Sequence, residues 1–302
     1  MLVIKPIKPV DQIIIEIVRE ITAVSKTQYL DLLLVGAQVK VILLEYIHGL
    51  NSGRATADID FAIAVESWDQ FHQIKQSLIA TGKFKILSKV KHRLIYQPNI
   101  IEHGFVIDII PFGKVQDNNN MIVWPPEFDV IMNVSGYQEA LESALLVELN
   151  DELTIKVPSL AGLIILKIFA WSERGTTTEN KDAVDLLTLL STYYEAGNAD
   201  RVYEVLPQDI IELLDYNPML MGAWLSGYDL ATIADCGTVA SITKLIERKK
   251  ENLILQMAKS FSHSENALEA TEDLLSAFMQ GIHKITIESQ KNALSNKQIK
   301  PD

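Results

Sequence analysis

The chain has 302 residues, of which 48% are hydrophobic and 22% are charged, a composition typical of folded proteins with one large or two smaller domains. Its formal net charge of −12 argues against a broad nucleic-acid-binding surface, because non-specific phosphate binding needs a basic one. The chain has no apolar run long enough to span a bilayer, no signal-peptide pattern, and a single cysteine, Cys236. We therefore expect a soluble, cytoplasmic protein with no membrane partner.

Helix and strand patterns alternate in the first half of the chain. Helical spacing of apolar residues predicts helices at 11–24, 36–46 and 67–80. Short apolar runs predict strands at 32–35, 58–63, 84–87, 93–96 and 105–110. Residues 116–126, with three successive asparagines, predict a loop or a hairpin tip, and strands follow at 128–134, 145–149 and 153–157.

The pattern becomes helical from Pro158 onward. The clearest helices are predicted at 158–173 and 181–196, and several more continue to about residue 287. The last residues are rich in Lys, Gln, Asn and Ser. We predict an α+β fold, in which a mixed sheet with flanking helices (residues 1–157) precedes a mainly helical domain (158–290) and a disordered tail (291–302).

Three aspartates stand out against apolar neighbours. Asp58 and Asp60 occupy alternate positions of one predicted strand, so both side chains point to the same face. Asp108 lies in a second apolar strand. Carboxylates gathered on a sheet are suitable ligands for magnesium, and a cation would relieve their repulsion. The alternatives are acids that protect an edge strand from aggregation, for Asp58 and Asp60, and an ion-pair partner, for Asp108.

A strand–glycine–helix junction precedes these aspartates. Gly36 ends the predicted strand at 32–35, and Ala37 begins the next helix. A glycine at a helix start lets a phosphate approach the backbone amides and the positive end of the helix dipole. Two basic stretches, residues 83–93 and 244–250, are interpreted as solvated faces, with a local basic pocket as the alternative.

The combination of these motifs resembles the polymerase-β-type nucleotidyltransferase superfamily. The matching stretches are Leu34-Val35-Gly36-Ala37, Asp58-Ile59-Asp60 and Val106-Ile107-Asp108. The longer stretch from Arg54 to Phe61 is similar to the AbiEii branch, whose members are linked to toxin–antitoxin and phage-defence systems. That branch also has a lysine on a later helix and a basic–Asp–x–x–Asp segment, to which Lys167 and the segment 181–185 correspond. The resemblance covers roughly residues 30–195.

The resemblance implies transfer of a nucleotidyl group from a nucleoside triphosphate such as ATP, with Mg²⁺ or Mn²⁺ as cofactor. Asp58 and Asp60 would hold two metal ions that clamp the triphosphate. Asp108 would bind the catalytic metal and help to remove the proton from the attacking hydroxyl. The acceptor would be RNA, a protein hydroxyl or a small molecule, and an antitoxin protein is an expected partner.

Further residues receive binding roles from the same resemblance. Arg54, Lys167 or Lys181 would offset charge on the departing pyrophosphate, and Lys167 would act in catalysis. The expected nucleotide-binding residues are Gly36, Ala37, Arg54, Thr56, Lys181 and Asp185.

Several of these residues have alternative interpretations. Thr56 either contacts phosphate or bonds to its own backbone, and Lys181 and Asp185 are spaced to pair on one helix face. Lys167 has apolar helical neighbours, so its charge must reach solvent or meet an anion. Where most members have a second glycine or a serine, this chain has Ala37, which lacks a phosphate-binding hydroxyl. The alternative function is therefore a catalytically weak member of the fold that acts as a binding or regulatory partner.

Overall fold

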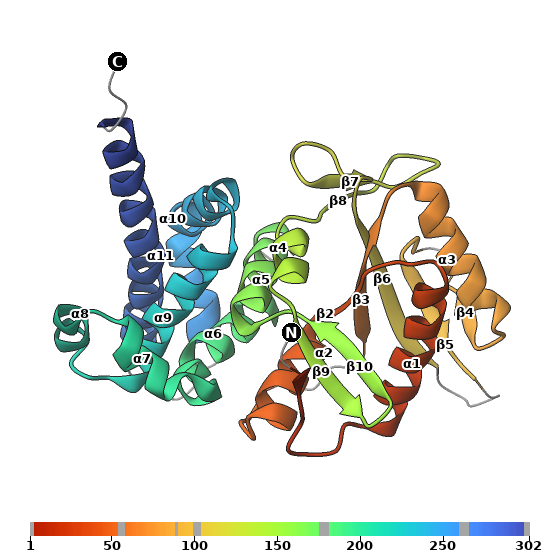
Figure 1. The fold of residues 1–302 in the computed structure, drawn as a ribbon, viewed down its shortest axis with the longest axis horizontal. Coiled ribbons are helices and arrows are strands. Elements are labelled where there is room, and N and C mark those ends of the chain that lie inside the picture. The colour runs from red at the N-terminus through yellow and green to blue at the C-terminus, as the bar shows by residue number, and fades with distance from the viewer. Residues whose placement is uncertain are drawn as a thin grey trace. The chain divides into compact units, whose positions relative to one another are not determined.

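The structure is a computed structural model that describes residues 3–53, 58–87, 90–98, 104–174, 181–259 and 266–298. The chain divides into two compact units, residues 1–159 and 160–302, next to the predicted domain boundary at 157/158 (Figure 1). The first unit contains β1 (Val3–Ile4), α1 (Gln12–Thr27), β2 (Leu32–Val35), α2 (Ala37–Val41), the π-helix η1 (Ile42–Ile47), β3 (Ile59–Val65), α3 (Trp68–Ala80), β4 (Phe84–Ile86), β5 (Arg93–Tyr96), β6 (Phe105–Gly113), β7 (Met121–Val123), β8 (Ile131–Asn133), α4 (Tyr137–Glu142), β9 (Leu145–Asn150) and β10 (Leu153–Val157).

The core of the first unit is a mixed eight-stranded sheet in the order β1-β9-β10-β2-β3-β6-β5-β4. Its centre joins β2 and β3 antiparallel, β3 and β6 parallel, and β6 and β5 antiparallel. The strand β3 therefore lies next to β6 although the β4–β5 hairpin comes between them in sequence. This crossover brings the two acidic strands together.

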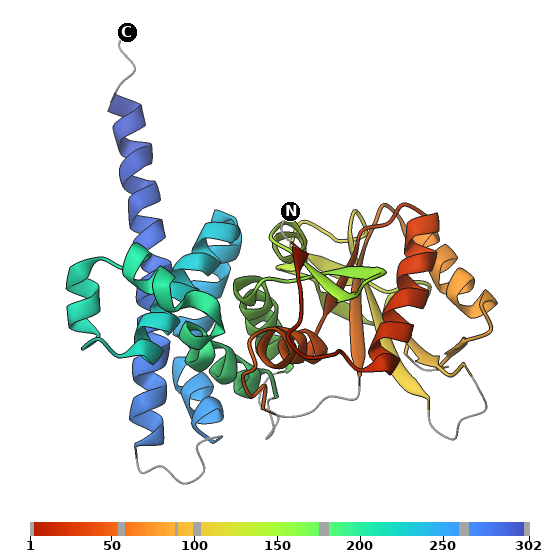
Figure 2. The ribbon, with the colours of Figure 1, turned by 60° about the horizontal axis from the view of Figure 1, so that its bottom comes forward.

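Alternation along β3 explains how the sheet is covered. Ile59, Phe61 and Ile63 are buried on one face, and Asp60 points to the other face. The helices α1 and α3 pack against each other and against the sheet, as both views show (Figures 1 and 2). Each begins at a side-chain cap, because Asp11 accepts a hydrogen bond from the Ile13 amide at 3.1 Å and Ser67 accepts one from the Gln70 amide at 3.2 Å.

Three predicted segments of the first unit differ from the structure in type or extent. The helix predicted at 36–46 is a short α-helix, α2, followed by the π-helix η1. Residues 121–123, predicted as part of a loop, form β7 and pair with β8, whereas the strand predicted at 128–134 is confined to 131–133. The hairpin connection is therefore 124–130 rather than the asparagine segment, which precedes β7. The Pro125-Pro126 pair lies in this connection and keeps it out of the ladder.

The second unit is helical. It consists of α5 (Leu160–Arg174), α6 (Lys181–Thr192), the π-helix η2 (Tyr194–Asn198), α7 (Ala199–Val205), α8 (Gln208–Leu213), α9 (Pro218–Ile233), α10 (Cys236–Ala258) and α11 (Ala267–Gln298). The helices α9 and α11 lie side by side (Figure 1). Their backbones touch at Gly227 and Gly281, where an added Cβ would come within 2.0 Å of the Phe278 and Trp224 carbonyl oxygens, respectively.

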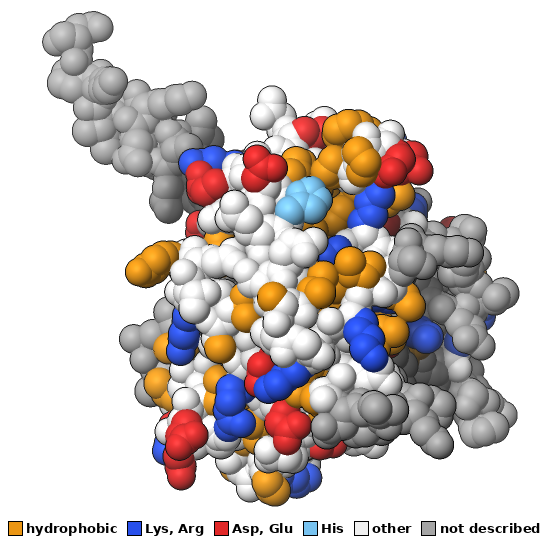
Figure 3. Space-filling model, turned by 90° about the vertical axis from the view of Figure 1, so that its right-hand side faces the viewer, with side chains coloured by type: hydrophobic (Ala, Val, Ile, Leu, Met, Phe, Trp, Pro, Cys, Tyr) orange, Lys and Arg blue, Asp and Glu red, His pale blue; other side chains and the backbone are white. Residues whose placement is uncertain are grey.

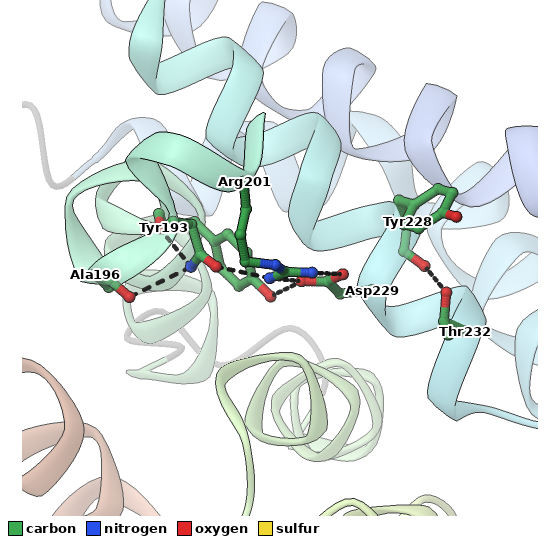
Figure 4. Close-up of polar contacts among 7 residues, drawn as sticks. Tyr193, Ala196, Arg201, Tyr228, Asp229 and Thr232 are labelled. Carbon is green, nitrogen blue, oxygen red and sulfur yellow. Dashed lines mark hydrogen bonds and ion pairs between the residues drawn. The ribbon is translucent and has the colours of Figure 1, made fainter. Parts of the chain in front are cut away.

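A polar cluster links the middle helices of this unit (Figure 4). Asp229 accepts two hydrogen bonds from the Arg201 guanidinium, each at 2.8 Å, and one from the Tyr193 hydroxyl at 2.6 Å. The Tyr193 ring is buried, and burial together with the Asp229 charge raises the pKa of Tyr193 well above its ordinary value.

The α+β prediction is confirmed. The helix α11 continues to Gln298 and so includes residues 291–298 of the segment predicted as a disordered tail, whose disorder stays a prediction. Residues 291–298 contain no Gly or Pro, and Ala, Leu, Lys and Gln among them have high helix propensity, so the polar composition does not exclude a helix. Within the described ranges, no helix has both the length and the apolar character needed to cross a membrane.

Candidate active site

One row of residues crosses the centre of the sheet. The register places Val35 of β2 opposite Asp60 of β3, Asp60 opposite Asp108 of β6, and Asp108 opposite Arg93 of β5. Paired residues on adjacent strands point to the same face about 5 Å apart, so the carboxylates of Asp60 and Asp108 are neighbours. The structure therefore brings together two of the three predicted aspartates.

Gly36 fits closely against Asp60. Its backbone has φ 78° and ψ −160°, a conformation that essentially only glycine adopts. A Cβ added to Gly36 would lie 1.9 Å from Asp60 Oδ2. The absence of a side chain at Gly36 thus leaves space that the Asp60 carboxylate occupies, directly before the start of α2.

The start of α2 is the predicted phosphate-binding junction. In the described part of the chain, no side-chain oxygen caps the helix at Gly36. Ala37 is buried at the first helical position. Its methyl group offers no hydroxyl to a ligand, but the amides of the first turn are unaffected by this side chain.

Asp58 comes immediately before β3 and is exposed, so the strand begins one residue later than predicted. The charges of Asp58 and Asp60 both contribute to raising the pKa of Arg93 above its ordinary value, after the larger effect of a hydrogen bond with Asp108. All three carboxylates therefore act on one guanidinium group.

Arg93 binds Asp108 through both carboxylate oxygens. Its Nε donates to Asp108 Oδ1 at 2.7 Å, and a terminal nitrogen donates to Oδ2, also at 2.7 Å. The Asp108 residue is only 8% exposed, so this pair compensates a largely desolvated charge. The sequence-based interpretation of residues 83–93 as a solvated face is wrong for Arg93.

His92 is a second neighbour that the sequence analysis did not identify. Its Nε2 lies 3.8 Å from Asp108 Oδ2, and its ring packs against Trp124 with 5.6 Å between ring centroids. Burial lowers the pKa of His92 below its ordinary value, which outweighs the opposite effect of Asp108. The imidazole is therefore neutral at pH 7, and Arg93 is the main cation at Asp108.

The donor set fits a divalent cation in its chemistry. Carboxylate oxygens are ligands that Mg²⁺ and Mn²⁺ prefer, and Asp60 and Asp108 face each other across adjacent strands. The positively charged Arg93 guanidinium already forms an ion pair with Asp108. Within the described ranges, however, no three acidic, histidine or cysteine side chains surround a common point. Both oxygens of Asp108 are directed to Arg93 instead.

Lys167 lies in the second unit and meets anions there. Its Nζ is 3.0 Å from Asp182 Oδ1 and 2.6 Å from Asp185 Oδ2, and all three residues are buried. Asp182 and Asp185 are three residues apart in α6 and face α5 together. This cluster satisfies the Lys167 charge without a substrate, and the predicted contact between Lys167 and pyrophosphate stays a prediction.

The remaining predicted binding residues have different outcomes. Lys181 is exposed at the first position of α6, and Asp185 binds Lys167. Arg54 and Thr56 lie outside the described residues. Their predicted contacts with phosphate and pyrophosphate stay predictions.

Figure 3 shows one face of the molecule, on the side of α3 and β4. Basic and acidic side chains are interspersed on it, with hydrophobic side chains between them. The net charge of −12 therefore does not make this face uniformly acidic. Such a surface is compatible with local recognition of phosphate groups.

The chain is similar to several solved structures at low sequence identity and low TM-score. An antigenic nucleotidyltransferase-like protein from Paracoccidioides brasiliensis is 14% identical with a TM-score of 0.40, over 65% of this chain and 89% of that chain. ANT(2'')-Ia in complex with adenylyl-2''-tobramycin is 10% identical with a TM-score of 0.36, over 60% and 90%. CCA-adding enzyme with ATP is 15% identical with a TM-score of 0.25, over 97% and 88%. No curated protein sequence gives a significant match.

A family model identifies the chain more directly. The model described as nucleotidyl transferase AbiEii toxin, Type IV TA system, matches residues 42–218, which is more than half of the chain. The matched range contains Asp58, Asp60 and Asp108 and extends into the helical unit as far as α9. The resemblance inferred from the motifs is thereby confirmed, and the chain belongs to the AbiEii family of nucleotidyltransferase toxins.

Proposed function

We propose that this enzyme transfers a nucleotidyl group from a nucleoside triphosphate to an acceptor hydroxyl, and that the reaction depends on Mg²⁺ or Mn²⁺. The observation that carries the proposal is the pairing of Asp60 with Asp108 on adjacent strands, beside the side-chain-free surface of Gly36. A divalent ion bound by Asp58, Asp60 and Asp108 would neutralise phosphate charge and help to align the reacting groups.

The chain's own residues have separable tasks in this proposal. Gly36 and Ala37 present backbone amides at the start of α2 to the phosphates, a role that the missing hydroxyl of Ala37 does not remove. The acceptor oxygen attacks the α-phosphorus, and the bond from this phosphorus to the bridging oxygen breaks, so that pyrophosphate leaves. The carboxylate of Asp108 receives the acceptor proton.

Cations are needed where pyrophosphate leaves. The residues proposed for this task are Arg54, Lys167 and Lys181. For Lys167 the task would require a change of partner, since its ammonium group is bound by Asp182 and Asp185. We regard Arg54 and Lys181 as the better candidates for that reason.

The acceptor is proposed to be RNA, a protein hydroxyl or a small molecule, and an antitoxin protein is the proposed regulatory partner. A net charge of −12 favours an acceptor that is recognised over a small area, such as one end of an RNA, rather than along an extended duplex.

Transfer of label from each α-³²P-nucleoside triphosphate into a host lysate tests the proposal. With Mg²⁺ or Mn²⁺, the wild-type chain should label an RNA band, a protein band or a small molecule, and EDTA should abolish the label. Asp58→Ala and Asp60→Asn should each reduce transfer at least ~100-fold while the circular dichroism spectrum stays unchanged.

Asp31→Asn is the matched control, because Asp31 is a largely exposed aspartate that pairs with Lys156 on the same sheet. This variant should label the acceptor like the wild type. Transfer that survives both Asp58→Ala and Asp60→Asn would refute the metal-site assignment. Absence of transfer and of nucleotide binding by the wild type would instead favour the binding-protein function suggested by Ala37.

A further inference from the structure

Arg93 and Asp108 form a bidentate ion pair. Two parallel hydrogen bonds of 2.7 Å join a planar guanidinium to both oxygens of one carboxylate. The register of β5 and β6 places the two residues directly opposite each other, so the backbone as well as the side chains fixes the pair. The Arg93 side chain is 30% exposed and that of Asp108 is 11% exposed.

This geometry has a consequence for any divalent ion at the same carboxylate. A metal ion needs a lone pair of at least one Asp108 oxygen at close range, and Arg93 directs an N–H group at each oxygen. The two cations also repel each other. Arg93 thus takes one lone pair on each Asp108 oxygen and places a positive charge beside the carboxylate, so a metal ion and the complete Arg93–Asp108 pair compete at Asp108.

The electrostatic surroundings make Arg93 the dominant competitor. The positive charge of Arg93 is stabilised by Asp58 and Asp60 as well as by Asp108. His92 lies 3.8 Å from Asp108, a longer contact than either hydrogen bond from Arg93. The neighbouring Lys75 donates to the carbonyl oxygen of Lys91 and lies over the Phe71 ring, so its described contacts are to groups other than Asp108.

We propose that Arg93 is a positioning residue that occupies Asp108 in the metal-free enzyme and competes with the divalent ion for this carboxylate. Metal loading then includes the opening of at least one Arg93–Asp108 hydrogen bond, and the apparent metal affinity is set by this exchange. The inference rests on the proposed function, because it takes Asp108 as a metal ligand.

Binding of Mn²⁺, followed by electron paramagnetic resonance of the free ion, tests the inference without an activity assay. Arg93→Gln should lower the apparent dissociation constant of the Asp108-dependent site about tenfold, because it removes the competing cation and its charge-assisted hydrogen bonds. Arg93→Lys keeps the charge but loses the two-pronged contact, so its dissociation constant should lie between those of Arg93→Gln and the wild type.

A second readout separates competition from a general loss of structure. Without metal, Arg93→Gln should melt at a lower temperature than the wild type, because it leaves Asp108 largely buried without its main cation. Saturating Mn²⁺ should reduce this difference in melting temperature, because the bound ion stabilises the folded state and replaces the positive charge of Arg93 beside Asp108.

Arg201→Gln is the matched control, because it breaks a similar two-pronged pair, with Asp229, that involves none of the three carboxylates. It should lower the melting temperature to the same extent with and without Mn²⁺, and leave Mn²⁺ binding unchanged. Unchanged or weaker Mn²⁺ binding by Arg93→Gln, or by Arg93→Lys if the first variant does not fold, would overturn the inference.

Asp60→Asn and Asp108→Asn distinguish this failure from failure of the proposed function. If the wild type binds Mn²⁺ and both variants weaken this binding, the metal site exists, and the Arg93 variants then decide the inference alone. If the wild type binds no Mn²⁺, or if neither aspartate variant changes the binding, the proposed metal site is itself wrong and the inference about Arg93 is overturned with it.

Discussion

Gly36 and Asp60 are packed so closely that a methyl group on Gly36 would lie 1.9 Å from Asp60 Oδ2. The same glycine has φ 78°, which an L-residue rarely adopts. Two independent constraints, one conformational and one steric, therefore require glycine at the residue that joins β2 to α2.

Gly36→Ala should consequently impair the active site more than the fold. The strained backbone should cost about 1–3 kcal/mol of stability. Displacement of the Asp60 carboxylate should reduce nucleotidyl transfer about 100-fold, because reacting groups tolerate little misplacement. Chemical denaturation and the label-transfer assay measure the two effects separately.

Gly82→Ala provides the control for this prediction. Gly82 has φ 75°, but an added Cβ would meet no atom within 4 Å. This variant should lose stability and keep its transfer activity. Equal activity of Gly36→Ala and Gly82→Ala would show that the contact with Asp60 does not matter for the reaction.

The buried cluster around Lys167 leads to a second prediction. Lys167→Met would leave Asp182 and Asp185 buried together without the cation that binds both. Loss of one partner from a buried ion pair costs about 3–5 kcal/mol, so the unfolding midpoint in urea should fall markedly. Lys250→Met removes a cation from an exposed pair with Glu272 and should cost at most about 1 kcal/mol.

The same variant decides between the two interpretations of Lys167. If Lys167→Met is as stable as the wild type but inactive in label transfer, its charge acts on the substrate, as the family resemblance implies. If it is strongly destabilised and Asp185→Asn is destabilised as well, the cluster holds α5 against α6.

The acidic residues of the candidate site could be proposed from sequence because their signals are local. Alternation within β3 places Asp60 on the other face of the strand from Ile59 and Phe61. Asp108 is an isolated aspartate in an apolar strand, which indicates a special role. The register that makes Asp60 and Asp108 neighbours depends on long-range pairing across the β4–β5 hairpin. The periodicity within each strand does not fix this register, so the expected gathering of the carboxylates rested on their residue type and on the family resemblance.

Arg93 was missed for the same physical reason. Its neighbours Lys91 and His92 make the segment polar, and a polar segment is usually solvated. Only the pairing of β5 with β6 places the guanidinium opposite Asp108. Likewise, the apolar neighbours of Lys167 predicted an anion or solvent contact, but the identity of the anions depends on how α5 packs against α6.

The third prediction concerns alkaline pH and the Tyr193–Asp229 hydrogen bond. The pKa of Tyr193 is raised in the folded state by burial and by Asp229. The unfolded state therefore loses this proton first, near pH 10, and stability contributed by the neutral hydroxyl is fully present below that pH. It is lost as the pH rises from about 10 toward the higher pKa of the folded state.

Tyr193→Phe should reveal this contribution. At pH 7 the variant should be about 1.5–3 kcal/mol less stable, because Asp229 loses one of its hydrogen bonds. The difference in free energy of unfolding between the wild type and the variant should shrink as the pH rises above about 10. Only the wild type has a phenol that ionises more readily in the unfolded state than in the folded state. Urea denaturation between pH 7 and 11 measures both effects.

Tyr29→Phe, at a residue that is 96% exposed, should be as stable as the wild type throughout this pH range. A stability difference between the wild type and Tyr193→Phe that stays constant with pH would mean that Tyr193 has the same pKa in the folded and unfolded states.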